Sequence, residues 1–350
     1  MTADRIFTPH NAPEQGDAAL PDTILLFEKP EAYFFPFYKD RVFAPFGVPQ
    51  PSFRYLAYQL MRLLHLPCRS MFWGQWKDYA KRAKRVVIFD YGYQSGMERY
   101  IRRVNPQCRV FLFFWNKVNR YNRQHLRFSN PGAIFSTDRE DCARYGLKYN
   151  HIFYPMEFHT PYIPRPEQNR LFFLGADKGR APYIAALKQF LEKNGLICDI
   201  RVLPSPHERK SPGYRERFRD ILTDRRLSYG EYLEILKSRD ILLDVNQEGQ
   251  SALTMRVMES IYLSKKLITG NRHVLNYDFY HPDNILVLPE GGLPAGEDLL
   301  RFLRAPFRPY PEDVLEHYSF EHWLEGFTES KTPLQATGYQ TCSAAEQRGI

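Results

Sequence analysis

Residues 248–271 read EGQSALTMRVMESIYLSKKLITGN, and this stretch decides how the second half of the chain folds. Its spacing predicts a helix followed at once by the short apolar strand KLIT (266–269). Ser251, Met255 and Glu259 are four residues apart, so on one continuous helix they share a face. A carboxylate on that face must lie near water or a partner group. Two interpretations are open: a surface helix with one solvated glutamate, or a helix that presents a carboxylate to a ligand at the mouth of a parallel sheet.

Strands of the buried type alternate with helical patterns on both sides of this stretch. The predicted strands are 23–28, 85–90, 108–116, 132–137, 170–175, 197–203, 240–245, 266–269 and 284–288. Several are apolar on both faces, which is typical of a parallel sheet covered by helices on both sides. The sequence therefore predicts an α/β fold of two Rossmann-like halves, each a mostly parallel sheet.

Composition divides the chain into five parts. Residues 1–20 are polar and predicted to be a flexible N-terminus, and 21–155 form the first Rossmann-like domain. The proline-rich stretch 156–169 is predicted to be a linker. Residues 170–330 form the second Rossmann-like domain. Residues 331–350 have little apolar content and are predicted to be a disordered tail.

Local signals also place several helix ends. Ser228 and Glu231 have the spacing of a capping box, which predicts a helix that begins after Ser228. Ser136 or Thr137 is expected to cap the helix that follows the strand 132–137. A further helix is predicted from residue 53 to the residue before Pro67.

Charge and cysteine content exclude several classes of protein. The 350 residues carry a net charge of +8, which suits a partner that bears phosphate groups. Motifs of zinc fingers, RNP1 strands and KH loops are absent from the sequence, which argues against specific nucleic-acid binding. The five cysteines are far apart and include no C-x-x-C pair, which argues against a zinc ribbon or a disulfide scaffold. The sequence shows neither a signal peptide nor an apolar run that could span a bilayer, so we expect a cytoplasmic protein.

Ligands of open α/β sheets bind beyond the carboxyl ends of the strands, and one such position is the loop GADKGR (175–180). Gly175 and Gly179 permit a tight turn, while Lys178 and Arg180 bring positive charge beside the N-terminus of the next helix. The loop therefore predicts a diphosphate-binding cradle, with a purely structural turn as the alternative. It is neither a P-loop nor a G-x-G-x-x-G motif.

A second such position is the loop that follows the strand 240–245. Ser251 and Thr254 supply hydroxyl groups near the start of the following helix, where the helix dipole favours an anion. Glu259 lies further along that helix and is suited to accept hydrogen bonds from the vicinal hydroxyls of a ribose. One edge of the second sheet is thus expected to offer both phosphate contacts and a ribose clamp.

The first half has its own candidates at the ends of strands. Asp90 ends the strand 85–90 and is a candidate general base, with Asp138 as a second candidate and Asn116 as a polar contact. The alternative for Asp90 is a helix cap or a turn-forming residue. A nucleophile elbow is disfavoured, because Ser95 follows Gly92 by three positions rather than two.

The second half resembles the C-terminal domain of GT-B glycosyltransferases, in which two Rossmann-like domains face each other across the donor nucleotide. The resemblance is carried by GADKGR and by the strand, loop, glutamate-bearing helix and KLIT of residues 240–269. In the first half, VVIFDYG (86–92), FWN (114–116) and FSTDREDCARYGLKYNHIFY (135–154) resemble a bacterial surface-polysaccharide subgroup. Together the similar stretches cover residues 23–330.

The resemblance implies roles for the candidates of the second half. Glu259 becomes the ribose-binding carboxylate, and Lys178 becomes the lysine that neutralises a phosphate. Ser251 and Thr254 line the diphosphate loop, with Arg180 nearby. Many retaining members of the family carry a glutamate where this chain has Ser251, so the stereochemistry of transfer stays open.

The resemblance implies a cytoplasmic, metal-independent glycosyltransferase without a cofactor. Its donor would be a nucleotide-diphosphate sugar, and its acceptor a growing surface glycan, lipopolysaccharide, capsule or lipid-linked. No D-x-D motif is present to hold a bridging metal. The basic, aromatic N-terminal half is expected to contact an anionic inner membrane. The alternatives are a non-catalytic scaffold that retains this fold and a nucleotide-sugar epimerase of the same architecture.

Overall fold

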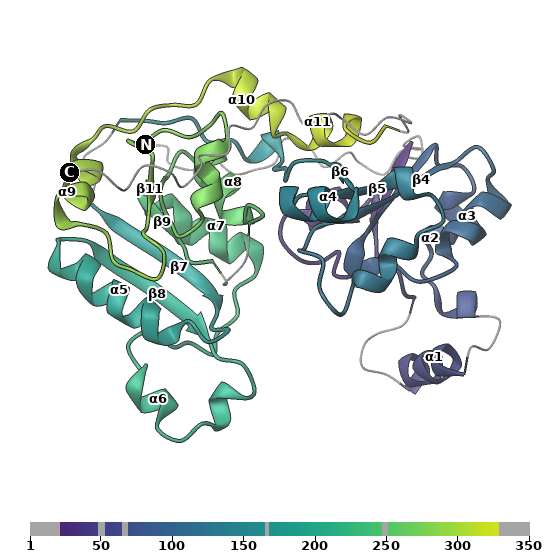
Figure 1. Cartoon of the computed structure of the whole chain (residues 1–350), viewed down its shortest axis with the longest axis horizontal. Coiled ribbons are helices and arrows are strands. Elements are labelled where there is room, and N and C mark those ends of the chain that lie inside the picture. The colour runs from purple at the N-terminus through teal and green to yellow at the C-terminus, as the bar shows by residue number, and fades with distance from the viewer. Residues whose placement is uncertain (1–21, 48–52, 65–68, 165–167, 247–250, 329–350) are drawn as a thin grey trace, which may run out of the picture.

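The computed structural model describes residues 22–47, 53–64, 69–164, 168–246 and 251–328. The predicted N-terminal segment 1–20 and the predicted tail 331–350 lie outside these residues. The described chain forms two α/β domains, shown side by side in Figure 1. Each domain is built on one parallel sheet.

The first sheet has the strand order β2-β1-β3-β4-β5-β6, and all of its pairings are parallel. Its strands are β1 (Thr23–Leu26), β2 (Val42–Phe43), β3 (Arg85–Phe89), β4 (Arg109–Phe114), β5 (Ile134–Ser136) and β6 (Lys148–Tyr149). Four of these strands lie within stretches predicted as strands. The two-residue strands β2 and β6 were not predicted.

Four α-helices and five short 3-10 helices accompany the described part of this sheet. The α-helices are α1 (Phe53–Leu63), α2 (Trp76–Ala80), α3 (Met97–Val104) and α4 (Arg139–Tyr145). The 3-10 helices are η1 (Phe35–Tyr38), η2 (Arg69–Phe72), η3 (Asp90–Gly92), η4 (Arg123–Arg127) and η5 (Pro131–Ala133).

The second sheet has the order β11-β10-β9-β7-β8 and is also parallel. Its strands are β7 (Arg170–Ala176), β8 (Ile197–Leu203), β9 (Ile241–Asp244), β10 (Lys266–Thr269) and β11 (Ile285–Val287). The helices are α5 (Ala181–Lys193), α6 (Tyr214–Arg217), α7 (Tyr229–Lys237), α8 (Met255–Tyr262), α9 (Gly296–Arg304), α10 (Glu312–His317) and α11 (Phe320–Glu325). The 3-10 helices η6 (Met156–Phe158), η7 (Glu208–Lys210) and η8 (Arg272–Asn276) complete the described chain.

Both faces of the second sheet are buried, as the apolar strands predicted. Leu171 and Phe173 of β7 pack into the same core cluster as Leu187 of α5 and Leu299 of α9. The intervening Phe172 points to the other face, where its ring lies 5.8 Å from that of Tyr232 on α7. Alternate residues of one strand thus serve two layers of helices. The predicted fold class, two Rossmann-like α/β domains, is confirmed, and the arrangement is consistent with a GT-B fold.

The chain returns to the first domain at its described C-terminal end. The Trp323 ring of α11 is fully buried and lies 5.1 Å from Phe113 of β4 and 4.2 Å from Phe153. Phe327 packs in the same way at 4.9 Å from Phe135 of β5. The strands of the first sheet lie within residues 23–149 and those of the second within residues 170–287, whereas α11, although it follows the second sheet in the sequence, covers the first sheet.

Aromatic side chains also join the two domains. The Tyr154 hydroxyl lies 2.5 Å from the Tyr229 hydroxyl of α7, and the Tyr154 ring lies 5.1 Å from Tyr262 of α8. Phe34, from the loop after β1, stacks edge-on against Tyr154 at 5.5 Å. All four residues belong to one buried cluster or to its margin. Much of the aromatic content of the sequence thus builds a continuous core across the domain boundary.

Two local predictions were wrong, and one was confirmed. Helix α4 is capped by Asp138, whose carboxylate accepts a bond from the Asp141 N–H at 3.0 Å, and not by Ser136 or Thr137. Ser251 does not share a helical face with Glu259, because α8 begins only at Met255. The capping box predicted at the start of α7 is present.

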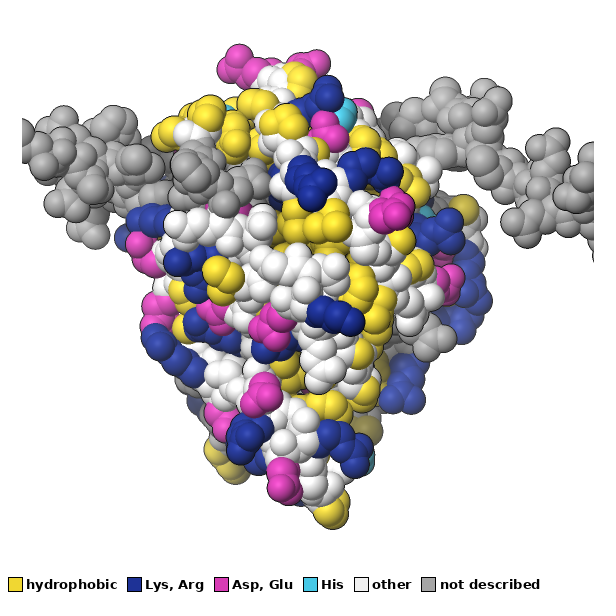
Figure 2. Space-filling model, turned by 90° about the vertical axis from the view of Figure 1, so that its left-hand side faces the viewer, with side chains coloured by type: hydrophobic (Ala, Val, Ile, Leu, Met, Phe, Trp, Pro, Cys, Tyr) yellow, Lys and Arg dark blue, Asp and Glu magenta, His cyan; other side chains and the backbone are white. Residues whose placement is uncertain are grey.

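The surface of the second domain is of mixed charge. Figure 2 shows Lys and Arg side chains interspersed with Asp and Glu on its outer face. Pairs such as Arg301 and Asp298, whose charged atoms lie 2.7 Å apart, are typical of a solvated surface. Within the described part of the chain, no helix combines the length and apolarity needed to cross a bilayer.

The contact of α11 with the first sheet leads to a prediction about stability. We expect Trp323→Ala to lower the free energy of unfolding by about 3–5 kcal/mol, because it leaves a cavity between α11 and β4. Urea denaturation followed by circular dichroism measures this loss. Glu325→Ala, which removes a side chain that is 78% exposed, is the control on the same helix. Equal stability of both variants would show that α11 is not part of the core.

Candidate functional site

Lys178 lies in the turn after β7, at the carboxyl edge of the second sheet. Its backbone has a φ of +52°, a left-handed conformation that few non-glycine residues adopt. Among the described residues its ammonium group has no hydrogen-bond or ion-pair partner. Partial burial, together with the positive charge of Arg180, lowers the pKa of Lys178. The lysine is therefore a cation held beside another cation without a neutralising acid.

Arg180 is anchored at the same edge. Its guanidinium donates to the carbonyls of Asp177 (3.0 Å), Ala176 (2.5 Å) and Val245. These bonds tie the end of β7 to the end of β9, and they leave two of the five guanidinium N–H groups for another acceptor. Burial and the charge of Arg256 lower the pKa of Arg180.

Two backbone N–H groups at the turn after β7 already have carboxylate acceptors. Asp177 accepts a bond from the Ala181 N–H at 2.6 Å, and Glu208 accepts one from the Gly179 N–H at 3.1 Å. These carboxylates satisfy donors that the sequence assigned to a ligand. The turn therefore presents side-chain cations rather than open backbone N–H groups.

Arg256 adds a third cation, which the sequence analysis did not single out. Its guanidinium donates to the Leu174 carbonyl at 2.6 Å and lies 3.4 Å from the Asp244 carboxylate. It also lies over the Phe173 ring, 5.0 Å from the centroid. The signal in the sequence is its position three residues before Glu259, one turn away on the same helix.

Glu259 lies on α8 and is only 4% exposed. Its two carboxylate oxygens accept bonds from the hydroxyls of Tyr232 (2.6 Å) and Tyr229 (3.2 Å), both on α7. Burial raises the pKa of Glu259, against the opposing effects of the Tyr232 hydroxyl and the Arg256 charge. The predicted ribose-binding carboxylate thus sits in a cage of tyrosines that the sequence did not reveal.

Tyr33 brings the first domain to this carboxylate. It follows β1, has a φ of +54° and is 43% exposed. Burial of its hydroxyl and the charge of Glu259 raise the pKa of Tyr33, while Arg256 lowers it. The charges of Glu259 and Arg256 on α8 therefore act electrostatically on a hydroxyl of the other domain.

Thr254 is the N-cap residue of α8, but its side chain makes no capping bond. Its hydroxyl oxygen is shielded from solvent and has no hydrogen-bond partner in the described structure. A buried hydroxyl without a partner is unfavourable by roughly 1–3 kcal/mol. Of the predicted donor-binding residues, Thr254 is the one whose polar atom is both buried and unsatisfied.

Ser251 and Asp138 meet across the domain boundary. The Ser251 hydroxyl donates to the Asp138 carboxylate at 2.6 Å, and the Ala252 N–H donates to the same oxygen at 3.2 Å. Asn271 holds the loop from the other side by donating to the Ala252 carbonyl at 3.1 Å. These two predicted site residues are thus brought together, as a link between the carboxyl edges of the two sheets.

Asp90 is 1% exposed at the end of β3. Its carboxylate accepts bonds from the Asn122 side chain (2.9 Å), the Trp115 N–H (3.3 Å) and the Asn116 side chain (3.4 Å). Burial raises the pKa of Asp90 to about 6, although these donors favour the charged form. Its hydrogen-bond partners in the described structure all belong to the first domain, and Asp90 also opens the 3-10 helix η3.

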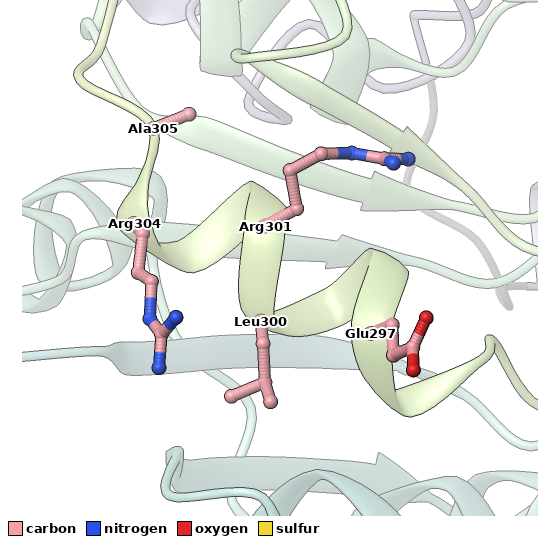
Figure 3. Close-up of a pocket in the computed structure, with 5 residues that line it drawn as sticks. All are labelled: Glu297, Leu300, Arg301, Arg304 and Ala305. Carbon is pink, nitrogen blue, oxygen red and sulfur yellow. The ribbon is translucent and has the colours of Figure 1, made fainter.

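A hollow on the second domain lies outside this set of residues. It is lined by Glu297, Leu300, Arg301, Arg304 and Ala305 of α9 and its end. Figure 3 shows that Arg301 and Arg304 extend in different directions from the helix, so their charges do not converge on one point. Among the described residues, no group of three or more His, Cys, Asp or Glu side chains is arranged to hold a metal ion.

Comparison with known proteins gives distant structural likenesses only. No family model matches the chain, and no curated protein matches it. The solved structure of TarM is similar with a TM-score of 0.46 and 8% identity, over 71% of this chain and 55% of TarM, so the chain spans about half the length of that protein. A glycosyltransferase from Rickettsia africae ESF-5 is similar with a TM-score of 0.39 and 8% identity, over 84% of this chain and 83% of that one. At these values neither likeness assigns the chain to a family or an activity.

The raised pKa of Asp90 predicts a pH-dependent stability. Between its ordinary value of 3.8 and about 6, the folded state holds a proton that the unfolded chain releases. This stabilises the fold as the pH falls below about 6, and the contribution is lost as the pH rises through that value. We expect the stability of the wild type relative to Asp90→Asn to be about 1 kcal/mol greater at pH 5 than at pH 7.5. Urea denaturation of both proteins at both pH values tests this, and a difference independent of pH would contradict it.

The link between Ser251 and Asp138 predicts a coupling across the domain boundary. Ser251→Ala leaves a buried carboxylate with one donor fewer and should lower the free energy of unfolding by about 1.5–3 kcal/mol. A double-mutant cycle with Asp138→Asn should give a coupling energy of about 1 kcal/mol or more. Ser238→Ala, an exposed serine at the end of α7, is the control. Strictly additive losses would mean that the two side chains do not interact in solution.

Proposed function

We propose that the protein is a glycosyltransferase that takes a sugar from a nucleotide-diphosphate donor bound at the carboxyl edge of the second sheet. The observation that carries this proposal is the grouping of Lys178, Arg180 and Arg256 there, with the pKa values of Lys178 and Arg180 lowered by burial and by a neighbouring cation. Cations held close to one another favour a multivalent anion between or beside them. A diphosphate has that charge.

The proposal assigns roles to four of the five predicted donor-binding residues, and the fifth, Ser251, bonds to Asp138 instead. The unpartnered ammonium of Lys178 neutralises the diphosphate, and the unsatisfied hydroxyl of Thr254 donates to one of its oxygens. Glu259 accepts hydrogen bonds from the ribose hydroxyls in exchange for those of Tyr229 or Tyr232. Arg180 mainly holds β7 to β9, so its share in donor binding is indirect.

In the reaction, the acceptor hydroxyl oxygen forms a bond to the anomeric carbon of the sugar, and the bond from that carbon to the diphosphate oxygen breaks. The nucleoside diphosphate leaves with the electron pair, and cations at the sheet edge stabilise it without a metal. The acceptor proton passes to a base. Asp90, with a pKa of about 6, has the basicity for this role, provided that its amide partners release it to the acceptor.

The acceptor that we propose is a growing bacterial surface glycan, lipopolysaccharide, capsule or lipid-linked, assembled in the cytoplasm. This part of the proposal is supported by the sequence stretches 86–92 and 135–154 and by the basic charge of the first domain. Whether transfer retains or inverts the configuration is left open by Ser251, which stands where many retaining enzymes have glutamate.

One observation favours a second candidate, a non-catalytic scaffold of the same fold. The oxygens of Glu259, the hydroxyl of Ser251 and most donors of Arg180 already have partners within the chain. A protein of this fold that no longer bound a sugar nucleotide would keep such internal contacts. The two candidates differ in whether Lys178 binds a diphosphate.

Nucleotide binding therefore tests the proposal. Calorimetry with UDP, GDP and dTDP should find one nucleoside diphosphate that binds the wild type, and Lys178→Ala should weaken its binding at least tenfold, since a lost bond between charged groups is worth about 1.5–3 kcal/mol. Stability should not change, because the ammonium has no partner within the described chain. Lys193→Ala, at the opposite end of α5, should bind like the wild type.

Binding of no nucleotide, or equal binding by Lys178→Ala and wild type, would refute the donor site and leave the scaffold as the better proposal. Glu259→Gln is the suitable companion variant, because its carbonyl oxygen can still accept the bond from one of the two tyrosines while its NH2 group donates to the hydroxyl oxygen of the other. Glu259→Ala would remove the acceptor of the buried Tyr232 hydroxyl, so a loss of stability could be mistaken for a loss of binding.

A further inference from the structure

Helix α1 exposes an apolar face to solvent. Phe53 is 85% exposed, Leu56 65%, Leu60 56%, Leu63 74% and Leu64, just past the helix end, 56%. At 3.6 residues per turn these five side chains occupy an arc of roughly 100°, so they form one continuous stripe. Soluble monomers rarely expose such a contiguous apolar surface without a partner for it.

Packing of the opposite face of α1 against the first domain keeps this stripe exposed to solvent. Tyr58 is 2% exposed, and its ring packs against Phe46 at 4.8 Å and Phe72 at 5.8 Å. Its hydroxyl donates to Gln94, in the turn before α3, at 2.5 Å. Rotating α1 to bury the leucines would expose Tyr58 and break this bond. The apolar face is therefore held in solvent by the packing of the other side.

The sequence segment that contains α1 is strongly basic. Residues 53–127 contain sixteen Lys and Arg against three Asp and Glu, a net charge of +13, whereas the rest of the chain carries −5. Two of the three acids, Asp90 and Glu98, are buried. On α3, Arg99 and Arg102 are exposed and have no ion-pair partner in the described structure. The same is true of Arg103, which lies over the Tyr100 ring.

We propose that α1 docks the protein onto an anionic lipid bilayer, with Phe53 and the four leucines inserted between acyl chains and the arginines of α3 at the headgroups. An apolar helical stripe within a strongly basic segment is the pattern of helices that lie in the interface of anionic membranes. A second copy of the chain fits less well, because pairing through α1 would bring two segments of charge +13 together. The proposal does not depend on the proposed transferase activity.

The position of α1 suits such docking. Figure 1 shows α1 at the lower edge of the first domain, away from its sheet, and α6 at the lower edge of the second domain. The chain around α6, residues 207–226, holds seven Lys and Arg against four Asp and Glu. A membrane that received α1 at this edge would therefore meet a second basic segment and no excess of acidic charge.

Vesicle sedimentation of the full chain, without substrate, tests the proposal. The wild type should bind vesicles of phosphatidylcholine with 30% phosphatidylglycerol at least tenfold more strongly than vesicles of phosphatidylcholine alone, and the binding should fall with added salt. Leu56→Asp/Leu60→Asp should lower the partition coefficient at least tenfold. The matched control is Ile163→Asp/Ile197→Asp, which changes two isoleucines 69% and 59% exposed elsewhere on the chain.

Arg99→Ser/Arg102→Ser/Arg103→Ser removes positive charge and leaves the apolar stripe of α1 unchanged. This variant should bind anionic vesicles more weakly than the wild type does, and its binding to vesicles of phosphatidylcholine should be unchanged. All variants should have thermal unfolding midpoints close to that of the wild type, because each altered side chain is exposed. Equal vesicle binding by Leu56→Asp/Leu60→Asp and wild type would overturn the proposal. The proposal would also be overturned if light scattering showed a dimeric wild type and a monomeric Leu56→Asp/Leu60→Asp variant, and if neither protein bound vesicles.

Discussion

The buried carboxylate of Asp138 is the interaction on which the relation between the two domains depends. A charge with no exposure to water must have its acceptor sites filled by the protein. One oxygen caps α4 through the Asp141 N–H, and the other accepts from Ser251 and Ala252 in the loop after β9. Because Asp138 follows β5, these bonds hold the carboxyl edges of the two sheets against each other. The carboxyl edge of the second sheet, where we propose that the donor binds, therefore faces the first domain.

Most of the fold could be predicted from the sequence because its decisive signals are local. The β-branched and aromatic runs that became β3, β4 and β9 need no distant partner to be recognised, and the capping box at Ser228 lies within four residues. The two-residue strands β2 and β6 exist only because a neighbouring strand pairs with them. The position of α11 likewise depends on Trp323 reaching Phe113, more than two hundred residues earlier, and no local pattern encodes that contact.

The candidate site was predictable only in part, for the same reason. Lys178 follows from a strand that ends in a glycine-containing turn, and the structure places it at the sheet edge. Sequence spacing put Ser251 on the helix of Glu259, but the helix begins four residues later and Ser251 bonds to the first domain instead. Tyr232 donates to Glu259 from α7, and the charge of Glu259 raises the pKa of Tyr33 in the other domain, so the part of both tyrosines in the site appears only in three dimensions.

The tyrosine cage around Glu259 limits which contacts could supply affinity for the donor that we propose. Where a ribose hydroxyl took the place of Tyr229 or Tyr232 at the carboxylate, one hydrogen bond would be exchanged for another, and such an exchange contributes little net free energy. Lys178 loses no partner within the described chain when it meets a phosphate, so its charge contributes nearly in full. Donor affinity should therefore depend mainly on the diphosphate, while Glu259 selects the orientation of the ribose. A sheet edge built in this way would bind nucleoside diphosphates tightly and nucleosides weakly, because the nucleoside offers only the exchange.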